Sequence, residues 1–245
     1  GGTYKPFRRA SDMSDLDPND RDCAFVLKEG VKIYGGFAGD EWSIEDRTAE
    51  SMASNPTILS GDIGVPGDDS DNAYHVLLGV NLTNATILDG FIIEGGNANG
   101  SGDLSVGSRN LSRSYGGGFY VVYASPLTSN LTIRNNYTSL EGGGVHLTNS
   151  SPLFLNNKIV NNTSLSRGGG IAAITSSPRI WQCLISENES NSGGGMYNIS
   201  NSSPIILNSI FSLNHASSNG GAMSNINSSP NLLNVLMNNN FAVVD

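Results

Sequence analysis

The fold is decided by residues 168–188, which read GGGIAAITSSPRIWQCLISEN and belong to a repeated unit. The repeat is marked most clearly by prolines that recur every 26 residues: Pro126, Pro152, Pro178, Pro204 and Pro230. A serine precedes each proline, and a glycine-rich cluster such as 168–170 or 193–195 comes earlier in each unit. Self-similarity at a fixed period is typical of solenoids and arrays.

Other positions of the unit form columns at the same spacing. An asparagine stands ten residues after each proline, at Asn136, Asn162, Asn188, Asn214 and Asn240. Seven residues after each proline the chain has Ile133, Ile159, Ile185, Phe211 and Met237. Four residues after each proline it has Asn130, Asn156, Gln182, Asn208 and Asn234. Five matching units exclude a coincidence.

The composition of the unit favours strands. Glycine, proline and asparagine are poor in helix interiors, whereas short apolar runs such as 184–186 and 205–207 suit strands. The leucine spacing of a leucine-rich repeat is absent. We therefore predict an all-β chain, a right-handed parallel β-helix with about three short strands in each coil and about 4.8 Å between coils.

Stacked coils give the columns a physical meaning. The column of Ile133 is expected to face inward and build the core. The asparagine column from Asn136 to Asn240 is expected to form a ladder whose amides bond to the coils above and below. Glycine clusters mark a corner that needs positive φ or close approach, and proline marks a strand start.

The N-terminal half contains degenerate units. Segments 31–36, 57–62 and 86–91 align at spacings of 25 and 29 residues, which indicates about eight coils in all. We divide the chain into an N-terminal cap and first coil (1–55), irregular coils with an acidic loop (56–113) and regular coils (114–245). Residues 1–25 and 38–55 are polar and are expected to form a cap or a side excursion.

Charge and cysteine content exclude several classes. The 245-residue chain has a net charge of −9, and neither half has the basic stripe of a nucleic-acid binder. No apolar run approaches the roughly 20 residues of a membrane helix, so this segment is not expected to insert into a membrane. Cys23 and Cys183 lack metal-ligand spacing. They could form one disulfide, but two separate buried thiols are favoured.

The repeat resembles a known group of proteins. Gly220-Gly-Ala-Met223 and Phe211-Ser-Leu-Asn214 resemble the repeats of chlamydial polymorphic outer-membrane proteins. Residues 55–63, 72–76 and 88–91 are similar to secreted bacterial β-helix repeat proteins of the pectin-lyase-like superfamily. The resemblance implies a β-helix in an extracellular or cell-surface setting. It implies little about activity, because such proteins include adhesins, passenger domains and stalks.

Acidic residues offer one candidate metal site. Hydrolysis needs carboxylates that meet at one face, but residues 104–244 contain no aspartate. The remaining candidate is the glycine-rich loop 61–72, where carboxylates could bind Ca²⁺ or form a solvated loop with its own turns: Asp62, Asp68, Asp69 and Asp71. The three histidines are dispersed and are expected to be structural or exposed.

The chain also contains thirteen Asn-x-Ser/Thr sequons, more than the 5 or 6 that its composition gives by chance. The repeat itself creates several of them, and Asn136, Asn162 and Asn188 are expected to be buried in the ladder. The exposed candidates for glycosylation in an extracellular setting are Asn81, Asn84, Asn99 and Asn110.

These observations favour a non-enzymatic extracellular structural protein: a stalk, an adhesin or a subunit of a fibre. Its expected partners are further copies, further domains of the same polypeptide, or surface glycans, and it requires no cofactor. The final coil, 232–237, is expected to expose apolar side chains, which predicts end-to-end or lateral association. The alternative is a carbohydrate-active, or calcium-dependent carbohydrate-binding, β-helix with its site near residues 60–95.

Overall fold

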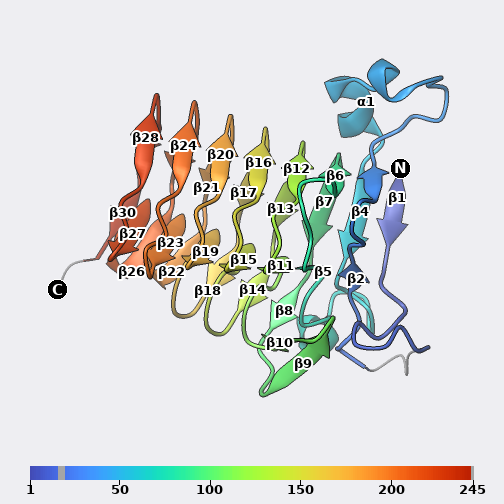
Figure 1. Cartoon of the computed structure of the whole chain (residues 1–245), viewed down its shortest axis with the longest axis horizontal. Coiled ribbons are helices and arrows are strands. Elements are labelled where there is room, and N and C mark those ends of the chain that lie inside the picture. Colours follow the sequence, from blue (N-terminus) through green and yellow to red (C-terminus); the bar gives the residue numbers. More distant parts are fainter. Residues whose placement is uncertain (16–19, 244–245) are drawn as a thin grey trace.

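The computed structural model describes residues 1–15 and 20–243 and is a parallel β-helix (Figure 1). Four parallel sheets run along its long axis, and each coil contributes one strand to each sheet in the regular part of the chain. We number the sheets in the order in which the chain meets them after each repeat proline. The predicted fold class is confirmed, although a short fourth strand joins the three expected in each coil.

The first two sheets carry the strands that follow the repeat proline. The first sheet contains, in spatial order, β28 (Asn231–Leu233), β24 (Ile205–Leu207), β20 (Arg179–Trp181), β16 (Leu153–Leu155), β12 (Leu127–Ser129), β6 (Ile87–Asp89) and β3 (Lys32–Tyr34). The second sheet contains β1 (Gly2–Tyr4), β4 (Thr57–Ser60), β7 (Phe91–Glu94), β13 (Thr132–Arg134), β17 (Lys158–Val160), β21 (Leu184–Ser186), β25 (Ile210–Ser212) and β29 (Leu236–Asn238).

The other two sheets complete each coil. The third sheet contains β30 (Phe241–Ala242), β26 (His215–Asn219), β22 (Glu189–Ser192), β18 (Thr163–Ser164), β14 (Tyr137–Thr138) and β8 (Asn97–Ala98). The fourth sheet contains β2 (Phe25–Val26), β5 (Leu77–Val80), β11 (Phe119–Val122), β15 (Val145–Thr148), β19 (Ile171–Ile174), β23 (Met196–Ile199) and β27 (Met223–Ile226). An antiparallel hairpin of β9 (Asp103–Val106) and β10 (Arg109–Ser112) projects from the body.

The repeat period sets the register between coils. Ile133 pairs with Ile159, Ile159 with Ile185, and Ile185 with Phe211, so the predicted inward column stacks as expected. These four side chains are fully buried, whereas Met237, the fifth member of the predicted column, pairs with Phe211 in the same register but is 43% exposed in the last described coil. Because parallel in-register strands place the same repeat position in every coil, one residue choice per column builds a continuous apolar core.

Corners between the sheets explain why the chain is so rich in asparagine. Besides the glycine corner, three corners place a non-glycine residue in the left-handed region. Most of these residues are asparagine, which tolerates positive φ better than most side chains. The first corner, between the first and second sheets, has Asn130, Asn156, Gln182, Asn208 and Asn234 there, with φ between 49° and 55°. At the glycine corner the predicted positive φ is confirmed, for example 73° at Gly142.

Three irregular segments are inserted at corners among the described residues. Residues 35–56 separate β3 from β4 and contain η1 (Ile44–Asp46) and α1 (Ala49–Ser54). Residues 61–76 separate β4 from β5 and contain η2 (Asp69–Asp71), and the β9–β10 hairpin separates β8 from β11. No helix among the described residues is long and apolar enough to cross a membrane.

One predicted alignment is wrong. Segment 57–62 does not stack on 31–36 and 86–91, because β3 pairs with β6 in the first sheet whereas β4 pairs with β7 in the second. Strands β3 and β4 are therefore consecutive strands of one coil, like β6 and β7. The 22-residue insertion between β3 and β4 stands where the later coil has Gly90 alone. Because the insertion is nearly as long as one repeat, segment 57–62 was aligned with 31–36 as if it began the next coil.

Candidate functional site

The four acidic loop residues proposed as calcium ligands turn mostly toward their own loop. Asp71 accepts a hydrogen bond from the backbone of Val65 at 2.7 Å, and Asp68 caps η2 by accepting from Ser70 at 2.9 Å. Asp62 lies 3.4 Å from Lys5 and also accepts from Gly67, while Asp69 accepts from Asn72.

Those contacts hold the carboxylates against the backbone and side chains of the loop and against Lys5. In the described part of the chain, no three histidine, cysteine, aspartate or glutamate side chains converge as metal ligands would. Calcium binding by this loop stays a prediction. One oxygen of Asp71 and one of Asp62 accept no hydrogen bond among the described residues, and such carboxylate oxygens are ligands that Ca²⁺ takes.

The four sequon asparagines chosen as exposed are exposed in the structure. Asn81 is engaged by Gly107 and Arg109, and Asn99 accepts from Arg21 at 2.8 Å. Asn84 lies in the exposed 83–85 turn, and Asn110 is on β10. Their accessibility is compatible with glycosylation, which stays a prediction. Asn136, Asn162 and Asn188 are almost fully buried, as predicted.

The asparagine ladder has its predicted geometry. Asn162 donates to the carboxamide oxygen of Asn188 from both its backbone and its side chain, each at 3.0 Å. The same pair of bonds joins Asn136 to Asn162 and Asn214 to Asn240. These bonds satisfy backbone groups where the second sheet bends into the third.

Sequence reasoning missed a second buried column at the first corner. Cys183 occupies it between Asn157 and Ser209, and its sulfur accepts from the Asn157 backbone at 3.4 Å. Burial raises the pKa of the Cys183 thiol to about 11. Cys23 and Cys183 are both free and buried, so the favoured interpretation of two separate thiols is confirmed. The 26-residue spacing of Asn157, Cys183 and Ser209 was the available signal.

Two histidines form a buried aromatic cluster on the outer side of the fourth sheet. His146 stacks on Tyr115 at 4.8 Å and meets Tyr120 edge-on at 4.8 Å, and Tyr120 also contacts His75. Burial lowers the pKa of His75 to about 4 and that of His146 to about 3. Both imidazoles are therefore neutral at pH 7 and act as packed core groups.

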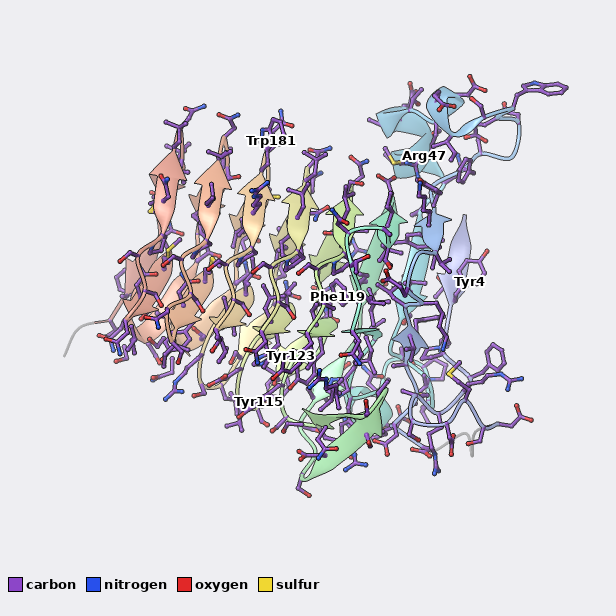
Figure 2. All side chains as sticks on the ribbon, viewed as in Figure 1. Tyr4, Arg47, Tyr115, Phe119, Tyr123 and Trp181 are labelled. Atoms are coloured by element: carbon purple, nitrogen blue, oxygen red, sulfur yellow. The ribbon has the colours of Figure 1, made fainter. Side chains whose placement is uncertain are left out.

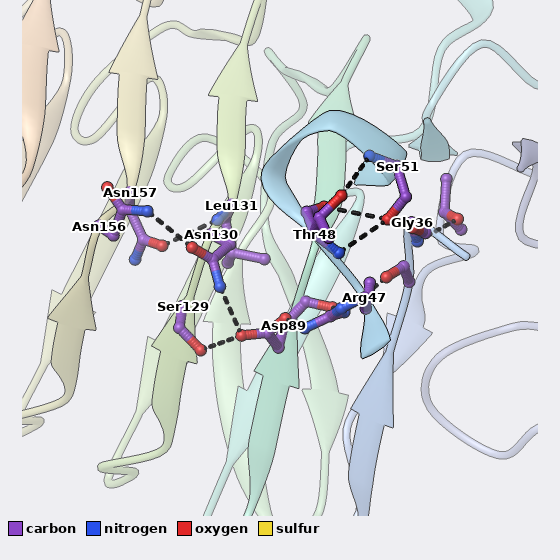
Figure 3. Close-up of polar contacts among 12 residues, drawn as sticks. Gly36, Arg47, Thr48, Ser51, Asp89, Ser129, Asn130, Leu131, Asn156 and Asn157 are labelled. Carbon is purple, nitrogen blue, oxygen red and sulfur yellow. Dashed lines mark hydrogen bonds and ion pairs between the residues drawn. The ribbon is translucent and has the colours of Figure 1, made fainter. Parts of the chain in front are cut away.

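A buried ion pair anchors the 35–56 insertion to the coils (Figure 3). The guanidinium of Arg47 contacts the carboxylate of Asp89 and donates to the carbonyl of Gly35 at 2.5 Å. Asp89 also accepts from Ser129 and, at 2.9 Å, from the side chain of Asn130. Both charged side chains are less than 10% exposed, so the pair fixes the position of α1 beside the first corner.

Beside this anchor lies a groove of about 210 Å³ between α1 and the second sheet. Its apolar part comes from α1 and β7, through residues such as Met52 and Ile92. Its polar part comes from the first corner and the strands after it, through Asn130, Asn156 and Lys158. The groove is smaller than the roughly 300–1,000 Å³ of a typical small-molecule pocket, so it could hold only part of a ligand.

The groove opens onto the exposed amides of the first corner, which are linked in pairs and then interrupted. Asn156 donates to Asn130 at 2.7 Å, and Asn234 donates to Asn208 at 2.8 Å. Among the residues that the structure describes, no hydrogen bond joins Gln182 to Asn156 or Asn208. The interruption leaves amide groups of three successive coils free for other partners.

An apolar strip runs beside these amides on the first sheet. Trp181 lies between Leu155 and Leu207 in the strand register and is 43% exposed. In Figure 2, Trp181 lies on the same side of the molecule as Arg47 and the insertion. The sequence did contain a signal for this site: position 182, directly after the tryptophan, has glutamine where the other four repeats have asparagine.

The site therefore offers amide groups, a cation, an apolar strip and a groove, which together can bind a polar ligand with apolar faces. No protein-family model, curated protein or solved structure matches the chain.

Proposed function

We propose that this protein is a non-enzymatic extracellular structural β-helix, a rigid rod that serves as a stalk, an adhesin or a subunit of a fibre. The observation that carries this proposal is the unbroken contact between coils: four parallel sheets and a buried amide ladder join each regular coil to the next. Such continuity stabilises an extended shape in which each repeat contacts its neighbours.

The sequence resemblance supports the extracellular part of the proposal. The glycine-cluster and Phe211-Ser-Leu-Asn214 elements resemble repeats of chlamydial polymorphic outer-membrane proteins, and the wider pattern resembles secreted β-helix proteins of the pectin-lyase-like superfamily. We infer that the chain belongs with these surface proteins. A surface rod rich in exposed sequons is also a suitable substrate for glycosylation at Asn84 and Asn110.

The test of this function is location. Antibodies against the 245-residue chain should label intact cells of the source organism, and external protease should remove the label. Labelling that requires lysis would contradict the proposal. Mass spectrometry of the native protein would show at the same time whether the exposed sequons carry glycans.

Self-association is part of the same proposal. The last described coil exposes Leu233, Leu236 and Phe241, each more than half exposed, and such side chains suit contact with another copy or another domain. Light scattering and electron microscopy of the purified chain test this. Concentration-dependent filaments or lateral oligomers would support self-association, and a monodisperse monomer at all concentrations would contradict it.

A second candidate function is carbohydrate binding, favoured by the groove beside α1. Residues 90–92 line this groove, and they lie within the region 60–95 that the sequence suggested. Binding to a glycan array, repeated with and without a calcium chelator, tests it. Loss of binding on chelation would support a calcium-dependent module, whereas chelator-resistant binding would show that recognition does not need calcium.

A further inference from the structure

We propose that the first corner binds an anionic glycan, a chain of sugars bearing carboxylate or sulfate groups, along the coils of Asn156, Gln182 and Asn208. This inference rests on the second candidate function, carbohydrate binding, and names its site and ligand class.

Free cations on both sides of the corner carry the choice of an anionic ligand. Lys158 points outward from β17 in the second sheet, and Arg179 points outward from β20 in the first sheet. Both side chains are exposed, and within residues 1–15 and 20–243 neither has an ion-pair partner. The other charged pair beside the corner, Arg47 and Asp89, is already neutralised.

The surrounding coils provide no competing acid at this corner. In residues 114–240 the acidic side chains are Glu141, Glu187 and Glu189. Glu141 pairs with Arg167, and the other two flank the buried ladder at the second corner, between the second and third sheets. Within the regular coils the first corner therefore has two cations and no acid, which gives local charge complementarity to an anion. The 38–55 insertion beside it is acidic, with Asp40, Glu41, Glu45, Asp46 and Glu50, so this complementarity is confined to the coils of a chain whose net charge is −9.

The interrupted amide column supplies hydrogen bonds for sugar hydroxyls. If this exposed amide column continued through position 182, hydrogen bonds between side chains would use three groups that are now free. These groups are the carboxamide oxygen of Asn156, the amide of Gln182 and the side-chain nitrogen of Asn208. Each is instead exposed and without a side-chain partner among the described residues. Free donors and acceptors on successive coils suit a ligand with alternating hydroxyl groups.

The spacing and the apolar strip suit a sugar chain. Coils repeat at the strand spacing of about 4.8 Å, so amide groups recur at roughly the length of one sugar ring. The apolar strip of Leu155, Trp181 and Leu207 lies beside them and can contact the less polar face of such rings. The groove beside α1 then closes one end of the track at Asn156 and Lys158.

The experiment is a binding titration of the 245-residue chain with three hexasaccharides: a heparin-derived one, hexagalacturonate and neutral cellohexaose. We expect at least one acidic probe to bind at least about tenfold more tightly than the neutral probe. We also expect its affinity to fall as salt is raised, because the cations are exposed. The heparin-derived probe carries both sulfates and carboxylates, whereas hexagalacturonate carries carboxylates alone. Binding of the heparin-derived probe without hexagalacturonate would therefore show that sulfate is required.

Four variants locate the site. Lys158→Gln and Arg179→Gln should each weaken acidic-probe binding several-fold, and the matched control Lys28→Gln, an exposed lysine outside this corner, should leave it unchanged. Gln182→Asn should weaken binding while raising the melting temperature. The melting temperature should rise because the change extends the amide column and places asparagine at a φ of 55°. Weaker binding together with a higher melting temperature cannot result from simple loss of folding.

The possible results distinguish a failure of the proposed site at the first corner from a failure of carbohydrate binding altogether. If no hexasaccharide binds, carbohydrate binding and this inference both fail. If an acidic probe binds the wild type and the Lys158 and Arg179 variants equally, the chain binds glycans elsewhere and only this site is wrong. If cellohexaose binds as tightly as the acidic probes, the anionic class is wrong.

Discussion

Asn188 donates two hydrogen bonds to a single acceptor, the carboxamide oxygen of Asn214, from its backbone at 3.1 Å and from its side chain at 3.0 Å. Its side chain also donates to the carbonyl of Ile159 at 2.8 Å. Because Asn162 repeats these contacts one coil earlier, every ladder member satisfies groups that belong to neighbouring coils.

Replacing Asn188 with leucine should therefore destabilise the protein. The change leaves the two Asn162 donors and the Ile159 carbonyl without their partner, at roughly 1–3 kcal/mol for each buried group. Urea unfolding checks this. The control is Asn191→Leu at an exposed position of β22, which should stay within about 0.5 kcal/mol of the wild type. Equal melting of Asn188→Leu and wild type would mean that the ladder does not hold the coils together.

This ladder could be predicted from the sequence because parallel stacking converts a period of 26 residues directly into spatial neighbours. The columns of Ile133 and Asn136 needed no knowledge of side-chain packing, since one register fixed them all. The same logic failed at residues 57–62, where an insertion of nearly repeat length separated two consecutive strands of one coil. Length alone cannot distinguish an inserted excursion from a degenerate coil.

Thr175 offers a stabilising substitution. It has a φ of 51° in a corner column that also contains Tyr123, Asn149, Asn201 and Asn227, so asparagine is the commonest residue there. A β-branched side chain is strained in the left-handed region, so Thr175→Asn should raise the free energy of unfolding by about 1 kcal/mol. Thr163→Asn, in strand β18, is the control and should be neutral or destabilising. A lower melting temperature for Thr175→Asn would contradict this explanation of the asparagine-rich corners.

The Arg47–Asp89 pair should hold the 35–56 insertion in place. Asp89→Asn leaves the buried guanidinium without its counter-charge, at about 3–5 kcal/mol. Limited proteolysis should then cut within 38–55 much faster than in the wild type. The control is Asp15→Asn in the exposed Arg8–Asp15 pair, expected to cost less than about 1 kcal/mol. An uncut insertion in Asp89→Asn would show that other contacts position α1.

Stability should fall as the pH is lowered from 7.5 to 5. His75 and His146 are buried and neutral, with pKa values lowered to about 4 and about 3, so the unfolded chain binds protons first, near pH 6.5. At pH 5 each histidine should cost about 2 kcal/mol. The charged pairs beside the cluster are Asp22 with Arg113 and Glu141 with Arg167.

The pH effect is assigned by substitution. His146→Phe keeps the aromatic stack on Tyr115 and removes one titrating group, so it should roughly halve the loss of stability between pH 7.5 and pH 5. Urea unfolding at both pH values measures the difference. An unchanged pH dependence would show that the loss arises from other groups.

The open corner at Gln182 and the groove beside α1 were beyond sequence reasoning for a physical reason. The open corner depends on which side-chain hydrogen bonds are absent, and the groove depends on how the 35–56 insertion folds back onto the coils. Neither follows from the 26-residue spacing of the repeat. In the acidic loop, local turns use most of the four carboxylates as acceptors, and their closeness in sequence did not indicate these hydrogen bonds. Calcium binding by the loop stays a prediction.

Single-molecule force spectroscopy tests the central claim, that coil-to-coil bonding makes this chain a rod able to bear load. The protein would be pulled from its two ends. We expect a series of steps of about 9 nm, the extended length of one 26-residue coil, at forces that fall in Asn188→Leu. A single extension of the whole chain at low force, identical in wild type and variant, would contradict the proposed structural role.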